Sequence, residues 1–142
     1  GSTIWFPYTQ QLITKIEGVQ RKAVRFIFNK YRITDSPSQL LKKASFLTLH
    51  NRAKLARLEL LHQLLHNALN IDSSLYISLD KCKPSHHKNP LTLKEYSFRT
   101  ECFRYSFFPR ATTEWNGLDP HITNSTSLPK FVTLLEQLLH NT

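Results

Sequence analysis

The 142 residues are enough for one domain with a buried core, and the two cysteines are too few for a disulfide framework. Lysine and arginine number 19 against 10 aspartate and glutamate residues, which gives a net charge of +9 at pH 7. This imbalance indicates a polyanionic partner, either a nucleic acid or an anionic membrane surface.

A first helix is predicted from its N-cap, Thr9, to about Tyr31. One face carries apolar residues at helical spacing, namely Leu12, Ile16, Val19, Ala23, Phe26 and Ile27. Another sector carries four basic residues, Lys15, Arg21, Lys22 and Arg25. We therefore expect the apolar face to contact a core and the basic sector to face water.

The next two predicted helices begin at recognisable start signals. Either Asp35 or Ser36, followed by Pro37, opens a short helix over Ser38–Ala44, in the cap-then-proline arrangement. Thr48 caps a longer helix that extends to about Asn70. Because this helix carries leucine and alanine on two sides, we expect it to be central and packed on both faces.

Residues 80–94 predict an exposed basic loop, because they combine prolines, lysines and histidines without any periodicity. The loop is expected to separate two subdomains, one over residues 1–79 and one over residues 95–142. The second subdomain ends in a helix predicted over Leu128–His140, with Ser127 as its cap.

An aromatic segment, RYSFFPRATTEWNGLDP, occupies residues 104–120. Pro109 suits the first turn of a helix, and Asn116-Gly117 followed by Pro120 is a stop signal. The helical spacing of its aromatic residues favours a core over the alternative, an exposed platform on which bases stack. This segment therefore predicts stability more than function.

The expected fold is all-α, a compact helical domain of about five helices around the long central helix. The aromatic residues expected in its core are Trp5, Phe26, Phe107, Phe108 and Trp115.

Patterns typical of catalysis and metal binding are absent from the sequence. Its three glycines form no phosphate loop, and its acidic residues occur singly, without the close pair that would hold two magnesium ions. His62 and His66 have the i, i+4 spacing that can hold a metal, but lack the glutamate of the protease motif. A second set, Cys82, His86, His87 and Cys102, matches no zinc-finger spacing. We therefore expect no catalytic residue, no metal, no cofactor and no small-molecule substrate.

The positive charge is concentrated in residues 1–60, which hold 11 of the 19 basic residues and three of the 10 acidic ones. Such an excess predicts contacts with a phosphate backbone, although a solvated helix face is the simpler alternative. The predicted contact residues are Lys15, Arg21, Lys22, Arg25, Arg52, Lys54 and Arg57.

Two stretches resemble a known family. The segment WFPYTQQLITKIEGVQRKAVRFI, with Trp5, Val19-Gln20-Arg21 and Arg25-Phe26, is similar to the thumb of LINE-type (non-LTR) retrotransposon reverse transcriptases of the jockey and chicken-repeat groups. The run YSFFPRATTEWNGL, from Tyr105 to Leu118, resembles a signature near their C-terminus. Departures are Phe6, Ile16, Lys22 and Asp119, where the family commonly has an acidic residue, leucine, arginine and proline, respectively.

The resemblance implies a thumb-like region over residues 1–79 and the family's C-terminal region over residues 95–142. The palm's catalytic aspartates, which the family carries in an aromatic-Ala-Asp-Asp turn, have no counterpart in this sequence. The expected function is therefore non-catalytic binding of RNA, DNA or an RNA–DNA hybrid through the backbone.

A second hypothesis is a protein-interaction or homodimerisation domain, in which the surface around Trp5, Val19 and Phe26 is covered by another polypeptide. A membrane role is not expected, because no apolar run approaches 18 residues and the basic helix has no wide free apolar face. The N-terminal residues lack the order of a signal peptide, so we expect an intracellular protein of the nucleus or cytoplasm.

Overall fold

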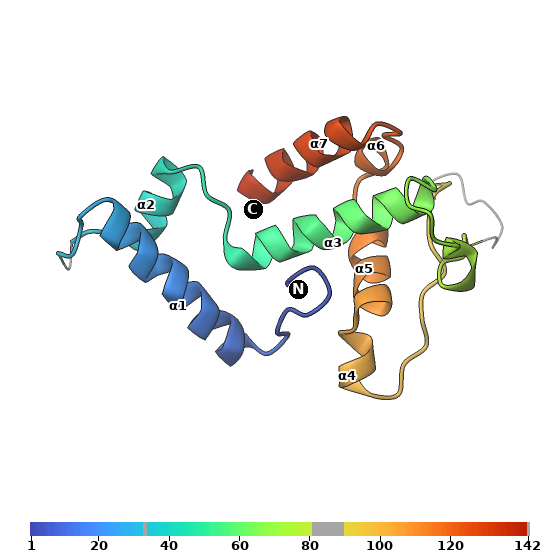
Figure 1. The fold of residues 1–142 in the computed structure, drawn as a ribbon, viewed down its shortest axis with the longest axis horizontal. Helices are drawn as coiled ribbons and strands as arrows, with labels where there is room; N and C mark the ends of the chain where they lie inside the picture. Colours follow the sequence, from blue (N-terminus) through green and yellow to red (C-terminus); the bar gives the residue numbers. More distant parts are fainter. Residues whose placement is uncertain (33, 81–89, 142) are drawn as a thin grey trace. The chain divides into compact units, whose positions relative to one another are not determined.

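The computed structural model describes residues 1–32, 34–80 and 90–141. These residues form an all-α fold, as expected, with an isolated antiparallel bridge between Leu79 and Leu93 in place of any strand (Figure 1). The α-helices in this part of the chain are α1 (Gln10–Ile27), α2 (Pro37–Lys43), α3 (Leu49–Leu65), α4 (Glu101–Arg104), α5 (Phe107–Asn116), α6 (Pro120–Thr123) and α7 (Leu128–Asn141). A 3₁₀ turn, η1, covers Ser73–Leu75.

The chain divides into two compact units, and the division falls inside α3. We call residues Phe6–Ala53 the basic unit, and Gly1–Trp5 together with Lys54–Thr142 the aromatic unit. The predicted division at residues 80–94 is different, because the chain on both sides of that loop belongs to the aromatic unit. Residues 81–89 of the loop lie outside the described residues.

In the basic unit, α1 packs against α2 and against the segment that leads into α3. Two polar side chains of α1 fix this packing. Gln20 Nε2 donates to the Leu47 carbonyl oxygen over 2.9 Å, and Glu17 Oε1 accepts from the His50 backbone N–H over 2.8 Å. A carboxylate at the first turn of a helix satisfies an unpaired N–H and lies at the positive end of the helix dipole. Glu17 therefore anchors the start of α3 to α1.

The predicted packing of α1 is wrong in one respect: its apolar stripe is largely exposed. Phe26 is 77% exposed, and Leu12, Val19 and Ile27 are also exposed, while Val24 is buried. The inward sector of α1 instead carries buried Val24 together with Glu17 and Gln20, which bond to the segment around the start of α3. Phe26 is thus not a core residue.

The aromatic unit has a core built where α5 and α7 lie against the part of α3 from Lys54 onward (Figure 1). Trp115 and Phe131 are fully buried and stack with ring centroids 5.6 Å apart. Leucine side chains fill the space around them, namely Leu58, Leu61, Leu93 and Leu135. Helices of this size bury a stripe rather than a whole surface, so three of them suffice to enclose one tryptophan.

Some of the aromatic residues predicted for the core are buried, and others are exposed. Phe107 and Trp115 are buried, and Phe108 is half-buried and stacks on Tyr76 with ring centroids 5.0 Å apart. Trp5 is 82% exposed, which contradicts its predicted place in the core. The backbone N–H groups of Ile4 and Trp5 donate to the Gly1 carbonyl and close a turn. This turn holds the backbone but leaves the indole exposed.

Helix boundaries follow the predicted caps closely at some ends. Ser36 is the N-cap of α2, and α7 begins at Leu128. The third helix ends at Leu65 and not near Asn70, because Asn67 adopts a left-handed conformation with φ of 51°. None of the helices in the described residues is long and apolar enough to cross a membrane.

Candidate nucleic-acid interface

A basic groove lies on the basic unit between α1 and the start of α2. Its volume is about 400 Å³, and its lining consists of Thr14, Gly18, Arg21, Lys22, Arg25 and Pro37. The five residues from α1 share one side of the helix, since they are spaced at i, i+4, i+7, i+8 and i+11. Gly18 contributes no side chain and a Cβ there would meet nothing within 4 Å, so the middle of the groove stays open.

The three cations of this basic groove differ in exposure. Arg21 and Lys22 are exposed, whereas Arg25 is half-buried. Arg25 NH2 donates to the Asp35 backbone oxygen over 3.3 Å, and its buried Nε has no partner among the described residues. The Arg25 guanidinium is thus held at the groove by its bond to the backbone of Asp35.

Among the described residues, no carboxylate lines the groove to neutralise these charges. Arg21 Nε lies 3.4 Å from the backbone oxygen of Glu17, whose side chain is already engaged at the start of α3. Two guanidinium groups and one ammonium around an open space suit a phosphate, because charge-assisted bonds to phosphate oxygens are short and strong. The geometry favours an anion with several acceptor oxygens.

The structure brings together three of the seven predicted contact residues. Lys15 is exposed on α1 but does not line the basic groove. Arg52 is exposed on the first turn of α3, and Lys54, which belongs to the aromatic unit, is half-buried. The sequence interpretation missed Thr14 and Gly18, although their helical spacing relative to Arg21 and Arg25 could have identified them.

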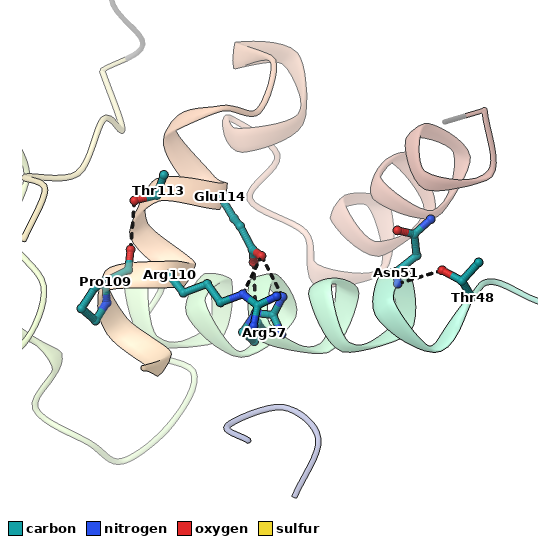
Figure 2. A network of polar contacts seen from close by, with 7 residues as sticks. All are labelled: Thr48, Asn51, Arg57, Pro109, Arg110, Thr113 and Glu114. Atoms are coloured by element: carbon teal, nitrogen blue, oxygen red, sulfur yellow. Dashed lines mark hydrogen bonds and ion pairs between the residues drawn. The ribbon is translucent and has the colours of Figure 1, made fainter. Parts of the chain in front are cut away.

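Arg57 is the exception, because it is buried in the aromatic unit with only 1% of its surface exposed. Figure 2 shows the Glu114 carboxylate of α5 between the guanidinium groups of Arg57 and Arg110. Arg57 Nε and NH2 donate to the two carboxylate oxygens over 3.1 and 2.7 Å, and Arg110 Nε lies 3.3 Å from Oε1. Arg57 cannot reach a phosphate backbone, so its predicted role in nucleic-acid binding is wrong.

The buried network carries two positive charges and one negative charge. Burial lowers the pKa of Arg110, the nearby Arg57 lowers it further, and Glu114 opposes both effects. A guanidinium still stays charged at neutral pH, so the cost of its burial must be offset by bonds to Glu114. Glu114 is therefore the residue on which this part of the core depends.

The motif Trp115-Asn116 clamps a distant segment of the chain. Trp115 Nε1 donates to the Leu91 carbonyl over 2.9 Å. The Asn116 amide accepts from the Leu93 N–H over 2.9 Å and donates to the Leu93 carbonyl over 2.8 Å. These side chains replace a neighbouring strand for residues 91–93, which gives the dipeptide an architectural role.

His62 is buried beside this core and is not arranged as a metal ligand. Its Nε2–H donates to the Ser125 carbonyl over 2.7 Å, and its ring stacks on Phe131 at 4.5 Å. Burial lowers the pKa of His62, and the neighbouring His66 lowers it further, although the bond to Ser125 raises it. His62 is thus a neutral structural residue.

No group of three histidine, cysteine, aspartate or glutamate side chains in the described residues could hold a metal ion. Cys102 is exposed on α4. The other residues of the zinc set weighed from the sequence, Cys82, His86 and His87, lie outside the described residues.

Comparison of the chain with protein-family models, curated proteins and solved structures gives no match. The resemblance to retrotransposon reverse transcriptases therefore stays a prediction from the sequence.

Proposed function

We propose that the protein is a non-catalytic module that binds RNA or an RNA–DNA hybrid through the phosphate backbone. We further propose that it derives from the post-catalytic part of a retrotransposon reverse transcriptase. The observation that supports binding is the basic groove, in which Arg21, Lys22 and Arg25 surround an open space without a carboxylate.

Backbone recognition fits the chemistry of the groove better than recognition of bases. Its cations suit the negatively charged phosphates, and none of its described lining residues has an aromatic ring or a side-chain amide that could read a base edge. The excess of positive charge in residues 1–60 would add to the affinity without adding sequence preference.

Binding should be measured by fluorescence anisotropy with duplex RNA, duplex DNA and an RNA–DNA hybrid across a salt series. The test variant is Arg21→Gln with Lys22→Gln, because both side chains are exposed and their loss should not disturb the fold. The matched control is Lys42→Gln with Lys43→Gln, two exposed lysines of α2 that do not line the groove.

The groove variant should weaken binding to all sequences equally and reduce the slope of log affinity against log salt by about two, at ~0.9 for each lost phosphate contact. The control should change the slope by less. Equal effects of the two variants would show that the net charge, and not the groove, determines binding, and no binding at low salt would refute the function.

A second candidate, a protein-interaction or homodimerisation domain, is favoured by the exposed apolar side chains of α1. Val19, Phe26 and Ile27 are each more than 60% exposed. Several exposed apolar side chains on one helix are typical of a surface that binds another polypeptide. Gel filtration with light scattering tests self-association. A dimer that Phe26→Glu dissociates would support this candidate, and a strict monomer would exclude the homodimer.

A further inference from the structure

The surface around α4 in the aromatic unit exposes aromatic rings that the core does not use. Phe98 is 43% exposed and Phe103 is 44% exposed. Tyr96 and Tyr105 are half-buried in the same segment, and the Tyr96 and Phe103 rings meet edge to face with centroids 6.1 Å apart. Exposed phenylalanine is costly in water, so a cluster of such rings indicates a surface that contacts another molecule.

Two arginine side chains lie against rings of this segment. The Arg104 guanidinium lies 5.1 Å from the Phe98 ring centroid and 5.5 Å from that of Tyr105. The Arg110 guanidinium, which belongs to the buried network with Glu114, lies 5.9 Å from the centroid of the same Tyr105 ring. A guanidinium held over a ring keeps its in-plane N–H groups directed outward, where they can bond to phosphate oxygens.

The charges at this surface leave Arg104 available. Arg104 NH1 lies 3.3 Å from Glu101 Oε1, but both side chains are exposed, and such pairs contribute little. Lys94 and Arg99 are exposed in the same segment, as is one further carboxylate, Glu95, so the segment 94–104 has a net charge of +1. A polyanion can therefore displace Glu101 at small cost.

We propose that this ring surface, defined by Phe98, Phe103 and Arg104, binds single-stranded nucleic acid by stacking. Unpaired bases lie on the two phenylalanine rings, and Arg104 contacts the phosphates between them. The strand must be single, because paired bases do not present their faces. Phenylalanine has no hydrogen-bonding group, so the contact tolerates any base. This inference rests on the proposed function and adds a strand type and a second site to it.

The probes that test stacking are a twelve-residue oligothymidine and an abasic oligomer of the same length and charge, both measured by anisotropy at low salt. The test variant, Phe98→Leu with Phe103→Leu, keeps apolar side chains but removes the rings. The conservative variant, Phe98→Tyr with Phe103→Tyr, keeps the rings. Ile71→Ala is the control, because Ile71 is an exposed apolar residue of the same unit outside the ring surface.

Oligothymidine should bind more tightly than the abasic oligomer, and the leucine variant should lose about tenfold to a hundredfold in affinity for oligothymidine. The tyrosine variant and the control should bind as the unchanged protein does. Affinity for the abasic oligomer should not respond to either ring variant. Glu101→Gln, a mild change, should strengthen binding of oligothymidine severalfold by releasing Arg104.

Equal affinity for both oligomers, or equal losses in the leucine and tyrosine variants, would overturn the inference. If the abasic oligomer binds as well as oligothymidine and still responds to Arg21→Gln with Lys22→Gln, the proposed function stands and stacking fails. If neither oligomer nor any duplex binds, both fail. A dimer that the leucine variant dissociates would assign the rings to a second copy of the chain and also overturn the inference.

Discussion

Removal of the Glu114 carboxylate should destabilise the protein severely. In the unchanged chain this carboxylate accepts two bonds from Arg57 and lies 3.3 Å from Arg110 Nε. Glu114→Ala leaves two guanidinium groups close together, one of them 1% exposed, with no countercharge. We expect a loss of about 3–5 kcal/mol in the free energy of unfolding, which is typical when one partner of a buried ion pair is removed.

The expected loss of stability is large because the ion pair is buried, and not because it contains several hydrogen bonds. Exposed pairs of the same chemistry are worth about 0–1 kcal/mol, because water replaces the lost partner. The pair between Glu101 and Arg104 is exposed and provides the comparison within the same unit. Glu101→Ala should therefore cost less than about 1 kcal/mol.

Urea denaturation measured by tryptophan fluorescence checks this prediction. All variants should be made in a Trp5→Phe background. This change removes the exposed indole and leaves the buried Trp115 as the one tryptophan that reports on the core. A domain of this size has about 5–15 kcal/mol of stability, so the loss is measurable. Equal costs for Glu114→Ala and Glu101→Ala would refute the burial of this network. Arg57→Met and Arg110→Met combined with Glu114→Leu should recover much of the loss, since a network of apolar side chains needs no countercharge.

Three further changes test the core. Trp115→Ala should cost about 3–5 kcal/mol through the cavity it leaves, and a small loss in urea denaturation would show that the ring is not enclosed. Asn116→Ala should cost about 1–3 kcal/mol, because it leaves the Leu93 N–H and carbonyl unpaired; urea denaturation of Asn116→Ala that matches the unchanged protein would contradict the clamp. His62 has a lowered pKa in the fold, so the unfolded chain binds more protons and stability should fall as the pH drops below about 6.5. Urea midpoints from about pH 8 to pH 5 should show this fall, and His62→Gln should reduce it.

The candidate site was predictable from the sequence in part. The excess of basic residues and their positions on the first helix identify Arg21, Lys22 and Arg25, which line the basic groove. Local patterns do not show what lies opposite a side chain, so Arg57 was grouped with them. Its partner, Glu114, is 57 positions away in the chain.

The sequence alone determined the all-α class and several helix ends. Periodicity and capping depend on residues close together in the chain, so they predict where a helix begins whatever it packs against. The starts of α2 and α7 are examples. Only the tertiary structure decided which face of α1 is inward. Hydrophobicity favours burial of the apolar stripe with Val19 and Phe26, but these side chains are exposed in the structure. The face that is inward carries Glu17 and Gln20, which bond to His50 and Leu47. Hydrogen bonds between residues about 30 positions apart depend on how the chain comes together, and no window along the sequence contains them.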